Sequence, residues 1–183
     1  EALKRALNTG IPDTIRITDC RESAFGSEFH ARFSATGKRY TYHISLSEVS
    51  PFECRFVTAL HAKQFRLEEM LAATNLFLGK HDFAGFAARR EAGVAVSDSI
   101  REIFAIGWES KPEDRWVLSV EGSGFLYKMV RSIVGSLIQV GLGRLAISDI
   151  ERILEIANRT HEVNTAPPQG LFLERVFYPK EAL

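Results

Sequence analysis

Apolar and polar residues alternate along several parts of the chain, and this alternation predicts β-strands. In the second half of residues 29–46, the apolar or aromatic positions are Tyr40, Tyr42, Ile44 and Leu46. Because successive side chains of a strand point to opposite faces, these four share one face and the polar residues between them share the other. The pattern therefore predicts a half-buried strand that carries Tyr40.

Four further stretches have the alternation or composition of strands. They are residues 14–20, 99–109, 115–122 and 171–179. The sequence KPEDR lies between the second and the third, and this short polar connection predicts that the two strands form a hairpin. Pro179 ends the last strand, because proline cannot donate to a ladder of hydrogen bonds.

Apolar residues at helical spacing predict helices between these strands. Residues 66–78 form one amphipathic stretch, and Gly79 is expected to close it in the left-handed conformation. Residues 148–159 form another. There Ser148 is placed to cap the helix, and Glu151 is placed to complete a capping box.

The longest apolar segment is GSGFLYKMVRSIVGSLIQVG, at residues 122–141. Its length and its lack of breakers predict a helix that begins after Gly124 and continues to Gly141. Apolar side chains occupy most of the circumference, so the helix is expected to be largely buried. Lys128 and Arg131 interrupt the apolar stretch, which is also too short to cross a membrane.

The order of these elements predicts the class of fold. Helices and strands alternate irregularly along the chain, and predicted hairpin partners follow one another in sequence. We therefore predict an α+β fold with a mainly antiparallel sheet and helices packed on one face. No repeat, low-complexity tract or linker divides the sequence, so residues 1–183 are expected to form one region.

Composition narrows the classes of function. The 183 residues include 23 basic and 23 acidic side chains, so any nucleic-acid site must be a local patch rather than the whole surface. Cys20 and Cys54 are too few for a disulfide-stapled secreted protein and lack the spacing of a zinc site, which predicts a reducing, cytoplasmic setting. The five histidines are not spaced to place two metal ligands on one helical face, so no metal site is expected.

Arg131 is the strongest chemical signal in the apolar helix. Tyr127, Lys128, Arg131 and Gly135 are expected to share one face, where Gly135 leaves room for another backbone or a substrate. A guanidinium in apolar surroundings is costly unless a carboxylate or phosphate accepts its hydrogen bonds. The pattern leaves open whether Arg131 lines a cleft or forms a structural salt bridge. It also leaves open whether Tyr40 is a catalytic residue or a packed strand aromatic.

Four separated motifs resemble the tRNA pseudouridine synthase A family. They are FHARFSATGKRYTYHI, HDFAGF, GSGFLYKMVRSIVGSLIQVGLGR and TAPPQGLFLERVFYP, in the family's order over nearly the whole chain. The resemblance implies a pseudouridine synthase-like fold and the isomerisation of uridine to pseudouridine in the anticodon stem-loop of tRNA. It also implies a homodimer that uses no cofactor.

Members of that family carry a catalytic aspartate in an upstream motif similar to Gly-Arg-Thr-Asp-x-Gly-Val-His, and no such motif occurs in this sequence. The chain also begins without Met, inside a predicted helix that contains Leu3 and Leu7, so we expect processing or truncation of a longer chain. The sequence resembles the carboxy-terminal two-thirds of such an enzyme. Residues 1–28 would be the tail end of the amino-terminal part, and the chain alone is expected to be inactive.

The resemblance assigns roles to three matching residues. Tyr40, the first tyrosine of KRYTY, matches the active-site tyrosine that lies against the target base and helps to remove the C5 proton. Arg131 of KMVR matches the residue that pairs with the catalytic aspartate, which explains a charge within an apolar helix. Leu173 corresponds to an apolar residue near the target base.

A uridine that is detached, turned and reattached must leave its stack and enter a pocket. Basic residues around this pocket are expected to hold phosphates, which position RNA without reading its sequence. The candidates are Arg32, Lys38, Arg39 and Lys128. A further pair, Arg89 and Arg90, either contacts phosphate or is solvated.

Two other hypotheses remain open at this stage. The first is a non-catalytic RNA-binding module derived from a pseudouridine synthase, which would bind tRNA in a salt-sensitive way without isomerising any base. The second is that an acidic residue within the chain is itself the catalyst, with Asp82 of HDF the nearest candidate. Against this, aspartates before apolar runs commonly cap short helices.

Overall fold

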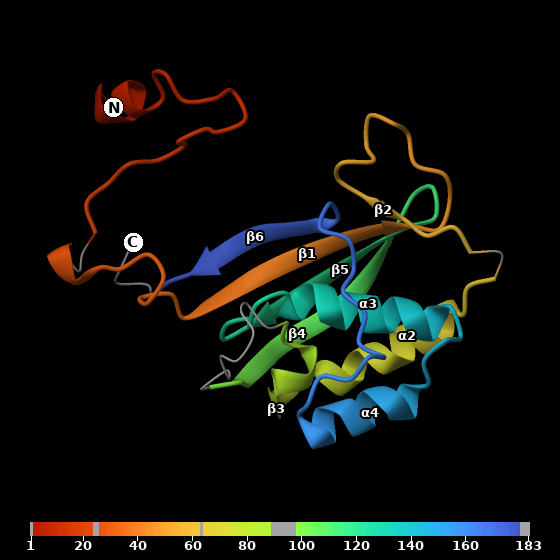
Figure 1. Cartoon of the computed structure of the whole chain (residues 1–183). Coiled ribbons are helices and arrows are strands. Elements are labelled where there is room, and N and C mark those ends of the chain that lie inside the picture. Colours follow the sequence, from red (N-terminus) through yellow and green to blue (C-terminus); the bar gives the residue numbers. More distant parts are fainter. Residues whose placement is uncertain (1, 24–25, 63, 89–97, 180–183) are drawn as a thin grey trace. The chain divides into compact units, whose positions relative to one another are not determined.

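The computed structural model describes residues 2–23, 26–62, 64–88 and 98–179 (Figure 1). The chain divides into two compact units. The smaller consists of Glu1–Ala35 with Tyr178–Leu183, and the larger of Thr36–Phe177. The assignment of residues 1–28 to the end of an amino-terminal part stays a prediction.

The smaller unit contains the helix α1 (Ala2–Leu7) and the 3-10 helix η1 (Gly26–Glu28). The predicted amino-terminal helix is confirmed, whereas the predicted strand at residues 14–20 is wrong, because this stretch forms no ladder with any described strand. The Asn8 side chain instead accepts a hydrogen bond from the backbone N–H of Ile17 and donates one to the Ile17 carbonyl, each at 2.9 Å. A side chain thus satisfies the backbone groups that a partner strand would otherwise pair.

Within the described residues, the larger unit is built on a six-stranded sheet. Its strands are β1 (Gly37–Ser45), β2 (Thr58–Ala59), β3 (Gly79–Asp82), β4 (Ile100–Lys111), β5 (Arg115–Gly122) and β6 (Leu171–Phe177). They lie in the order β2-β1-β5-β4-β3, and β6 also pairs with β1. Among these pairs only β1–β2 is parallel. β1, which carries Tyr40, therefore has neighbours on both sides.

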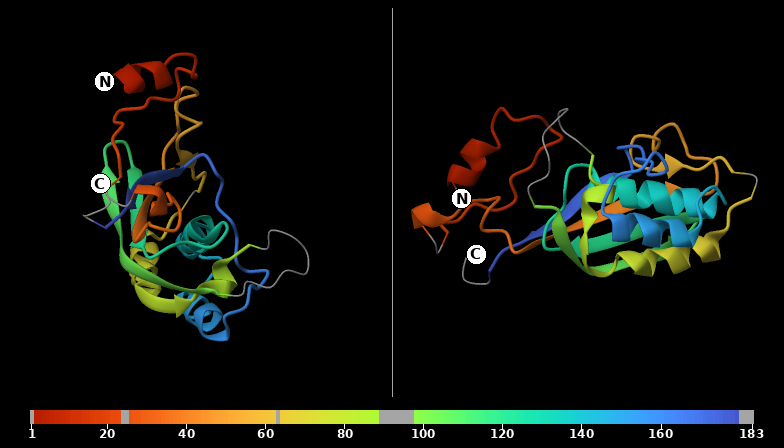
Figure 2. Two further views of the ribbon diagram at one scale, coloured as in Figure 1. Left: turned by 90° about the vertical axis from the view of Figure 1, so that its left-hand side faces the viewer. Right: turned by 60° about the horizontal axis from the view of Figure 1, so that its bottom comes forward.

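The helices of the larger unit cover one face of this sheet, as Figures 1 and 2 show. They are α2 (Leu67–Thr74), α3 (Met129–Gly141) and α4 (Ile147–Ile156), with the 3-10 helices η2 (Asn75–Phe77) and η3 (Phe83–Phe86). The predicted α+β class, with a mainly antiparallel sheet and helices on one face, is confirmed. None of the helices in the described ranges combines the length and the apolar character that crossing a membrane requires.

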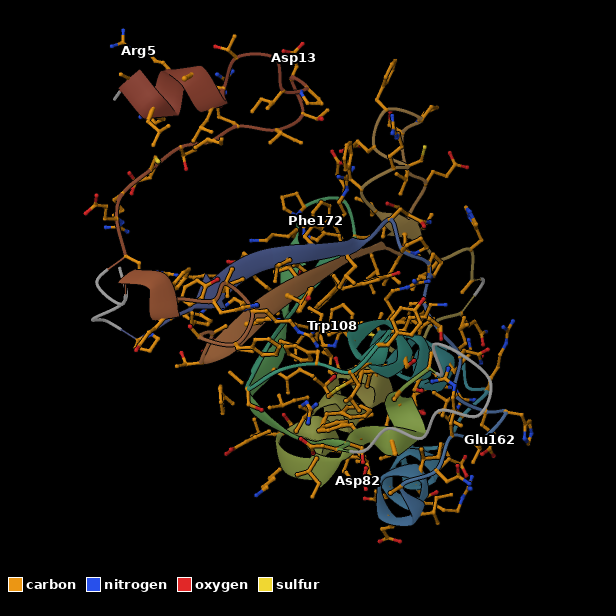
Figure 3. All side chains as sticks on the ribbon, turned by 60° about the vertical axis from the view of Figure 1, so that its left-hand side comes forward. Arg5, Asp13, Asp82, Trp108, Glu162 and Phe172 are labelled. Carbon is orange, nitrogen blue, oxygen red and sulfur yellow. The ribbon has the colours of Figure 1, made fainter. Side chains whose placement is uncertain are left out.

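The hydrophobic core lies between the helices and the sheet. Tyr42 and Ile44 of β1 and Leu118 of β5 have no exposed surface. On β4, the indole Nε1–H of Trp108, labelled in Figure 3, donates to the Thr74 Oγ1 of α2 at 3.0 Å. The helix layer is therefore attached to the sheet by a hydrogen bond as well as by apolar burial, which stabilises by about 1.5–3 kcal/mol for each large side chain.

The helix α3 begins at Met129, later than the sequence predicts. Lys128 occupies the N-cap with a φ of 59°, a left-handed conformation that a continuing helix does not contain. Tyr127 and Lys128 consequently precede the helix, so the prediction that they share a helical face with Arg131 and Gly135 is wrong. The predicted burial of this helix is confirmed, since almost all of its residues are buried.

The helix α4 begins at Ile147, so Ser148 lies inside the helix and the predicted Ser148 cap is wrong. The Asp149 carboxylate accepts a hydrogen bond from the backbone N–H of Ala146 at 3.0 Å. This contact is the reciprocal half of a capping box, supplied by the third helical residue. Because Asp149 satisfies that N–H, the helix can begin without a serine at its N-cap.

Residues with positive φ mark two connections of the sheet. Gly79 has a φ of 94°, as predicted, but it begins β3 rather than closing α2, which ends earlier at Thr74. Between β4 and β5, Glu113 and Asp114 have φ values of 63° and 53°. They belong to the three-residue connection 112–114, and Lys111 pairs with Arg115 across it, so the predicted hairpin is confirmed.

Candidate active site

Tyr40 lies within β1, paired with Val120 of β5 on one side and with Leu173 of β6 on the other. Its side chain is partly buried, and its ring meets Phe125 edge-on, with centroids 5.2 Å apart and ring planes at 88°. This burial raises the pKa of Tyr40 above the ordinary value of a phenol. At neutral pH, Tyr40 is therefore a protonated phenol whose ring is held by Phe125.

Tyr42 follows on the same face of β1 and is fully buried. Its hydroxyl donates to the Pro167 carbonyl at 2.7 Å and lies 2.8 Å from Thr58 Oγ1. Burial raises the pKa of Tyr42, while the hydrogen bond with Thr58 and the positive charge of Arg131 oppose this rise. Ala166, the residue before Pro167, accepts from Arg131 Nε–H, so Tyr42 and Arg131 bind adjacent residues of one segment.

Arg131 lies in the first turn of α3 and is partly buried. Its Nε–H donates to the Ala166 carbonyl at 2.7 Å, and its own carbonyl accepts from the Ala166 N–H at 2.9 Å. In the part of the chain that the structure describes, no carboxylate forms an ion pair with Arg131. The described acidic residues thus do not supply the structural salt bridge that the sequence left open.

The amino-terminal end of α3 has a positive potential. Lys128 at the N-cap is exposed, and its Nζ lies 5.2 Å from the centroid of the Tyr127 ring. The first turn of α3 contains no acidic residue, and the dipole of the helix adds partial positive charge at this end. Lys128, Arg131 and the helix end therefore form a region in which an anion is stabilised.

Lys38 and Leu173 share a side of the sheet with Tyr40. Lys38 precedes Tyr40 by two residues on β1, so strand alternation puts both on one face. Leu173 is the direct antiparallel partner of Tyr40, which places their side chains on the same side, and Leu173 is 52% exposed. An irregularity in the pairing of β1 with β6 occurs at this point, between Arg39 and Tyr40.

Arg39 and Arg32 make contacts of their own. The Arg39 guanidinium donates from Nε and Nη2 to Glu121 Oε2, and its Nη1 lies 3.7 Å from Glu174 Oε1. Since Arg39 is adjacent to Tyr40 on a strand, it faces the opposite side of the sheet. Arg32 belongs to the smaller unit, where its Cζ lies 5.4 Å from the centroid of the Phe33 ring. The pair Arg89 and Arg90 falls outside the described residues.

Asp82 stands at the N-cap of η3, where Figure 3 labels it. Its carboxylate accepts a hydrogen bond from the Ala84 N–H at 2.9 Å, so its interpretation as a cap is confirmed. Over the described ranges, no group of three or more His, Cys, Asp or Glu side chains is arranged to hold a metal ion.

Residues 163–166 pack against α3. The sequence predicted a close approach at Gly135 but did not identify the segment that approaches. A Cβ added to Gly135 would lie 2.2 Å from the Asn164 carbonyl oxygen, so the predicted close approach of another backbone at Gly135 is confirmed. The acceptor role of Ala166 and the ring contact of Phe125 were missed. No local pattern marks either one, because each contact joins elements that are separate in the sequence.

Comparison with known proteins adds a family to this geometry. The model of a family described as tRNA pseudouridine synthase matches residues 73–179. A protein named tRNA pseudouridine synthase A from Lysinibacillus sphaericus is 38% identical over 176 residues, which cover 96% of this chain and 69% of that protein. Proteins of the same name from Lactobacillus acidophilus and Acetivibrio thermocellus are 40% and 39% identical, and the chain covers 64% and 68% of them.

The chain thus spans about two thirds of the length of the relatives that it matches. A solved structure of a Cbf5-Nop10-Gar1 complex overlaps 59% of this chain at 14% identity, with a TM-score of 0.31. That degree of structural similarity is too low to support an argument about fold or function.

Proposed function

This chain belongs to the tRNA pseudouridine synthase family, and from this premise we propose that it is part of an enzyme that isomerises uridine to pseudouridine in the anticodon stem-loop of tRNA. The names of its relatives support the reaction and the class of substrate. Within this molecule, the observation that carries the proposal is the Arg131 guanidinium, held by the Ala166 carbonyl next to Pro167, whose carbonyl accepts from Tyr42 of β1.

Arg131 binds the catalytic carboxylate in this proposal. Its Nε–H is already used by Ala166, so the terminal nitrogens remain for an aspartate supplied by a segment outside this sequence. A carboxylate paired with a fixed guanidinium stays ionised and correctly oriented. This is the state that a nucleophile, or a base acting at the ribose, requires.

The isomerisation exchanges one glycosidic bond for another. The bond from ribose C1′ to N1 of the base breaks, the base turns, and a bond forms between C1′ and C5. C5 then loses its proton and N1 gains one, so the overall composition does not change. The enzyme must therefore hold the detached base and also accept the C5 proton.

Tyr40 performs both tasks in this proposal. The base lies against its ring, which Phe125 keeps in place, and Leu173 contacts the base from the adjacent strand. Because burial raises the pKa of Tyr40, its phenolate is scarce at neutral pH but strongly basic once formed. A proton acceptor of this kind suits a carbon acid such as C5–H.

The RNA backbone is held by Lys38 and Lys128. Lys38 shares the Tyr40 face of β1, and Lys128 precedes the amino-terminal end of α3, where the helix favours anions. Arg39 is engaged by Glu121 and Glu174, and Arg32 belongs to the smaller unit. Phosphate contacts by these two arginines stay predictions.

The remaining features of the proposal follow from the family resemblance and from composition. We expect a homodimer that acts on tRNA in the cytoplasm without a cofactor. We also expect this chain to be inactive without the aspartate motif, which does not occur in its sequence.

Tritium release tests the proposal directly. With tRNA labelled at uridine C5, the chain alone should release no tritium, whereas a version extended by a segment with the aspartate motif should release it. Release by the chain alone would mean that the nucleophile lies within these residues. If neither version released tritium and both bound tRNA in a salt-sensitive way, the non-catalytic RNA-binding module would be favoured.

A matched pair of variants isolates Arg131. In the extended version, Arg131→Gln should lower the release rate by about 10²-fold or more, because the carboxylate loses its partner. Arg144→Gln changes an exposed arginine beyond the end of α3 and should leave the rate unchanged. Equal rates for the two variants would contradict the role given to Arg131.

A further inference from the structure

Arg159 makes three hydrogen bonds, all to neutral acceptors. Its Nη1 donates to Ser132 Oγ at 3.0 Å, and its Nη2 donates to the Val163 carbonyl at 2.9 Å and to Thr165 Oγ1 at 3.0 Å. The guanidinium is partly buried, and this burial lowers the pKa of Arg159. No carboxylate within the described ranges forms an ion pair with it.

Partial burial of a charge without a carboxylate is unfavourable, so these hydrogen bonds must compensate for the lost hydration. A lysine could not make the same contacts, because its ammonium lacks the rigid fork that reaches several acceptors on two elements at once. Arg159 thus joins Ser132 on α3 to Val163 and Thr165 in the segment after α4.

The same segment holds Arg131. Immediately after Thr165, the Ala166 carbonyl accepts from Arg131 Nε–H, and the Ala166 N–H donates to the Arg131 carbonyl. Gly135 lets the backbone at Asn164 approach α3 closely. Residues 163–166 are therefore fixed on α3 by Arg159 near one end, by Arg131 at the other, and by a glycine between them.

We infer that Arg159 is a positioning residue: it fixes residues 163–166 on α3 so that the Ala166 carbonyl holds the Arg131 guanidinium in one orientation. This inference rests on the proposed function, in which Arg131 binds the catalytic carboxylate. A bidentate partner must be aligned within about 10–20° of the productive geometry. One Nε–H hydrogen bond provides that alignment only if its acceptor is itself fixed.

Hydrogen exchange of the Arg131 Nε–H tests the inference without any assay of activity. In this chain, labelled with ¹⁵N-arginine, the Arg159→Gln variant should exchange this proton about tenfold faster than the wild type, as expected when a hydrogen bond to a charged group weakens. Arg152→Gln is the matched control. Arg152 binds Glu162 and Asp149 but none of the acceptors of Arg159, so its loss should leave the exchange rate unchanged.

Unchanged exchange in a folded Arg159→Gln variant would overturn the inference. If that variant does not fold, Thr165→Val removes a single acceptor of Arg159 and should accelerate exchange by about threefold. An Arg131 Nε–H exchange rate in Thr165→Val equal to that of the wild type would then overturn the inference. Arg159→Lys, which keeps the charge and loses the fork, should fall between the wild type and Arg159→Gln.

The extended, catalytically competent version gives the second readout. There Arg159→Gln should lower kcat by about tenfold while KM stays within about twofold, because alignment of Arg131 matters in the transition state and RNA binding does not depend on it. A raised KM with unchanged kcat would indicate an RNA contact and would contradict positioning. If the extended wild type is itself inactive, the proposed function fails, and the exchange experiment still decides the role of Arg159.

Discussion

Arg131 and Tyr40 differ in how their surroundings prepare them for chemistry. Arg131 presents a guanidinium whose orientation is restricted by a backbone carbonyl at 2.7 Å. Tyr40 keeps its proton, because partial burial disfavours the phenolate and raises its pKa. One side chain is therefore suited to holding an anion that is always present, and the other to accepting a proton only during the reaction.

The proton acceptor can be tested at the residue scale. In the extended version, Tyr40→Phe should lower C5 tritium release by about 10²-fold or more, the usual contribution of a general base, while tRNA affinity stays within about twofold because the ring is retained. The wild-type rate should rise with pH through the range below the raised pKa of Tyr40, since each pH unit there increases the phenolate fraction about tenfold.

Tyr42→Phe is the control for this prediction. It removes a buried hydroxyl from the same face of β1, so it should cost about 1 kcal/mol of stability and keep the pH dependence. If Tyr40→Phe retained the rising pH profile, another group would have to accept the C5 proton.

At the scale of elements, α3 connects the core to the site. Its buried face packs against the sheet and α2, and its first turn presents Arg131. Lys128, in a left-handed conformation within the turn that precedes α3, sets where the helix begins. The close approach of residues 163–166 at Gly135 then places the Ala166 carbonyl opposite the Arg131 side chain.

The element-scale prediction concerns Gly135→Ala. An alanine in a helix is ordinarily about 1 kcal/mol more favourable than glycine, but here its Cβ would lie 2.2 Å from the Asn164 carbonyl oxygen. We expect a net loss of about 1–3 kcal/mol in the free energy of unfolding, measured by urea denaturation. Gly107→Ala on β4, where an added Cβ meets nothing within 4 Å, should change it by less than about 0.5 kcal/mol. A Gly135→Ala variant as stable as the wild type would contradict the close contact.

For the whole molecule, the hydrophobic core belongs to one unit. Every buried apolar side chain recorded for the described residues lies between Tyr42 and Ala166, whereas α1 contributes none. The sheet and its helix layer therefore carry the stability. Within this unit, β1 is paired with β5 on one side and with β6 and β2 on the other.

The larger unit should accordingly fold by itself. A chain of residues 36–177 should unfold cooperatively in urea, with a free energy of unfolding within about 1 kcal/mol of that of the full chain, because it retains the whole core. Residues 36–170 lack β6 and should be several kcal/mol less stable, because β1 loses a paired strand. Failure of residues 36–177 to fold would show that the smaller unit contributes to stability.

The sequence by itself determined the longer strands and helices of the larger unit and their buried faces, but it did not mark the short strands β2 and β3 and wrongly predicted a strand at residues 14–20. Period-two alternation identified the strand of Tyr40, helical spacing identified the burial of α3, and Gly135 identified a close approach. These features depend on neighbours along the chain, which is why a pattern reveals them. The predicted ends of elements were wrong at Lys128 and Ser148, because capping by a nearby side chain or a single left-handed residue decides where a helix begins.

Only the tertiary structure decided which of the candidate groups meet. Arg131 and its acceptor Ala166 are 35 positions apart, and Arg39 and Glu121 are 82 apart. Strand alternation alone puts Arg39 and Tyr40 on opposite faces of the sheet. The ion pair of Arg39 with Glu121, in contrast, depends on the register in which β1 and β5 pair. Contacts of this kind form when elements distant in the sequence pack in one register, so local periodicity cannot predict them. Periodicity does predict which faces are buried, and the burial of those faces brings the elements together.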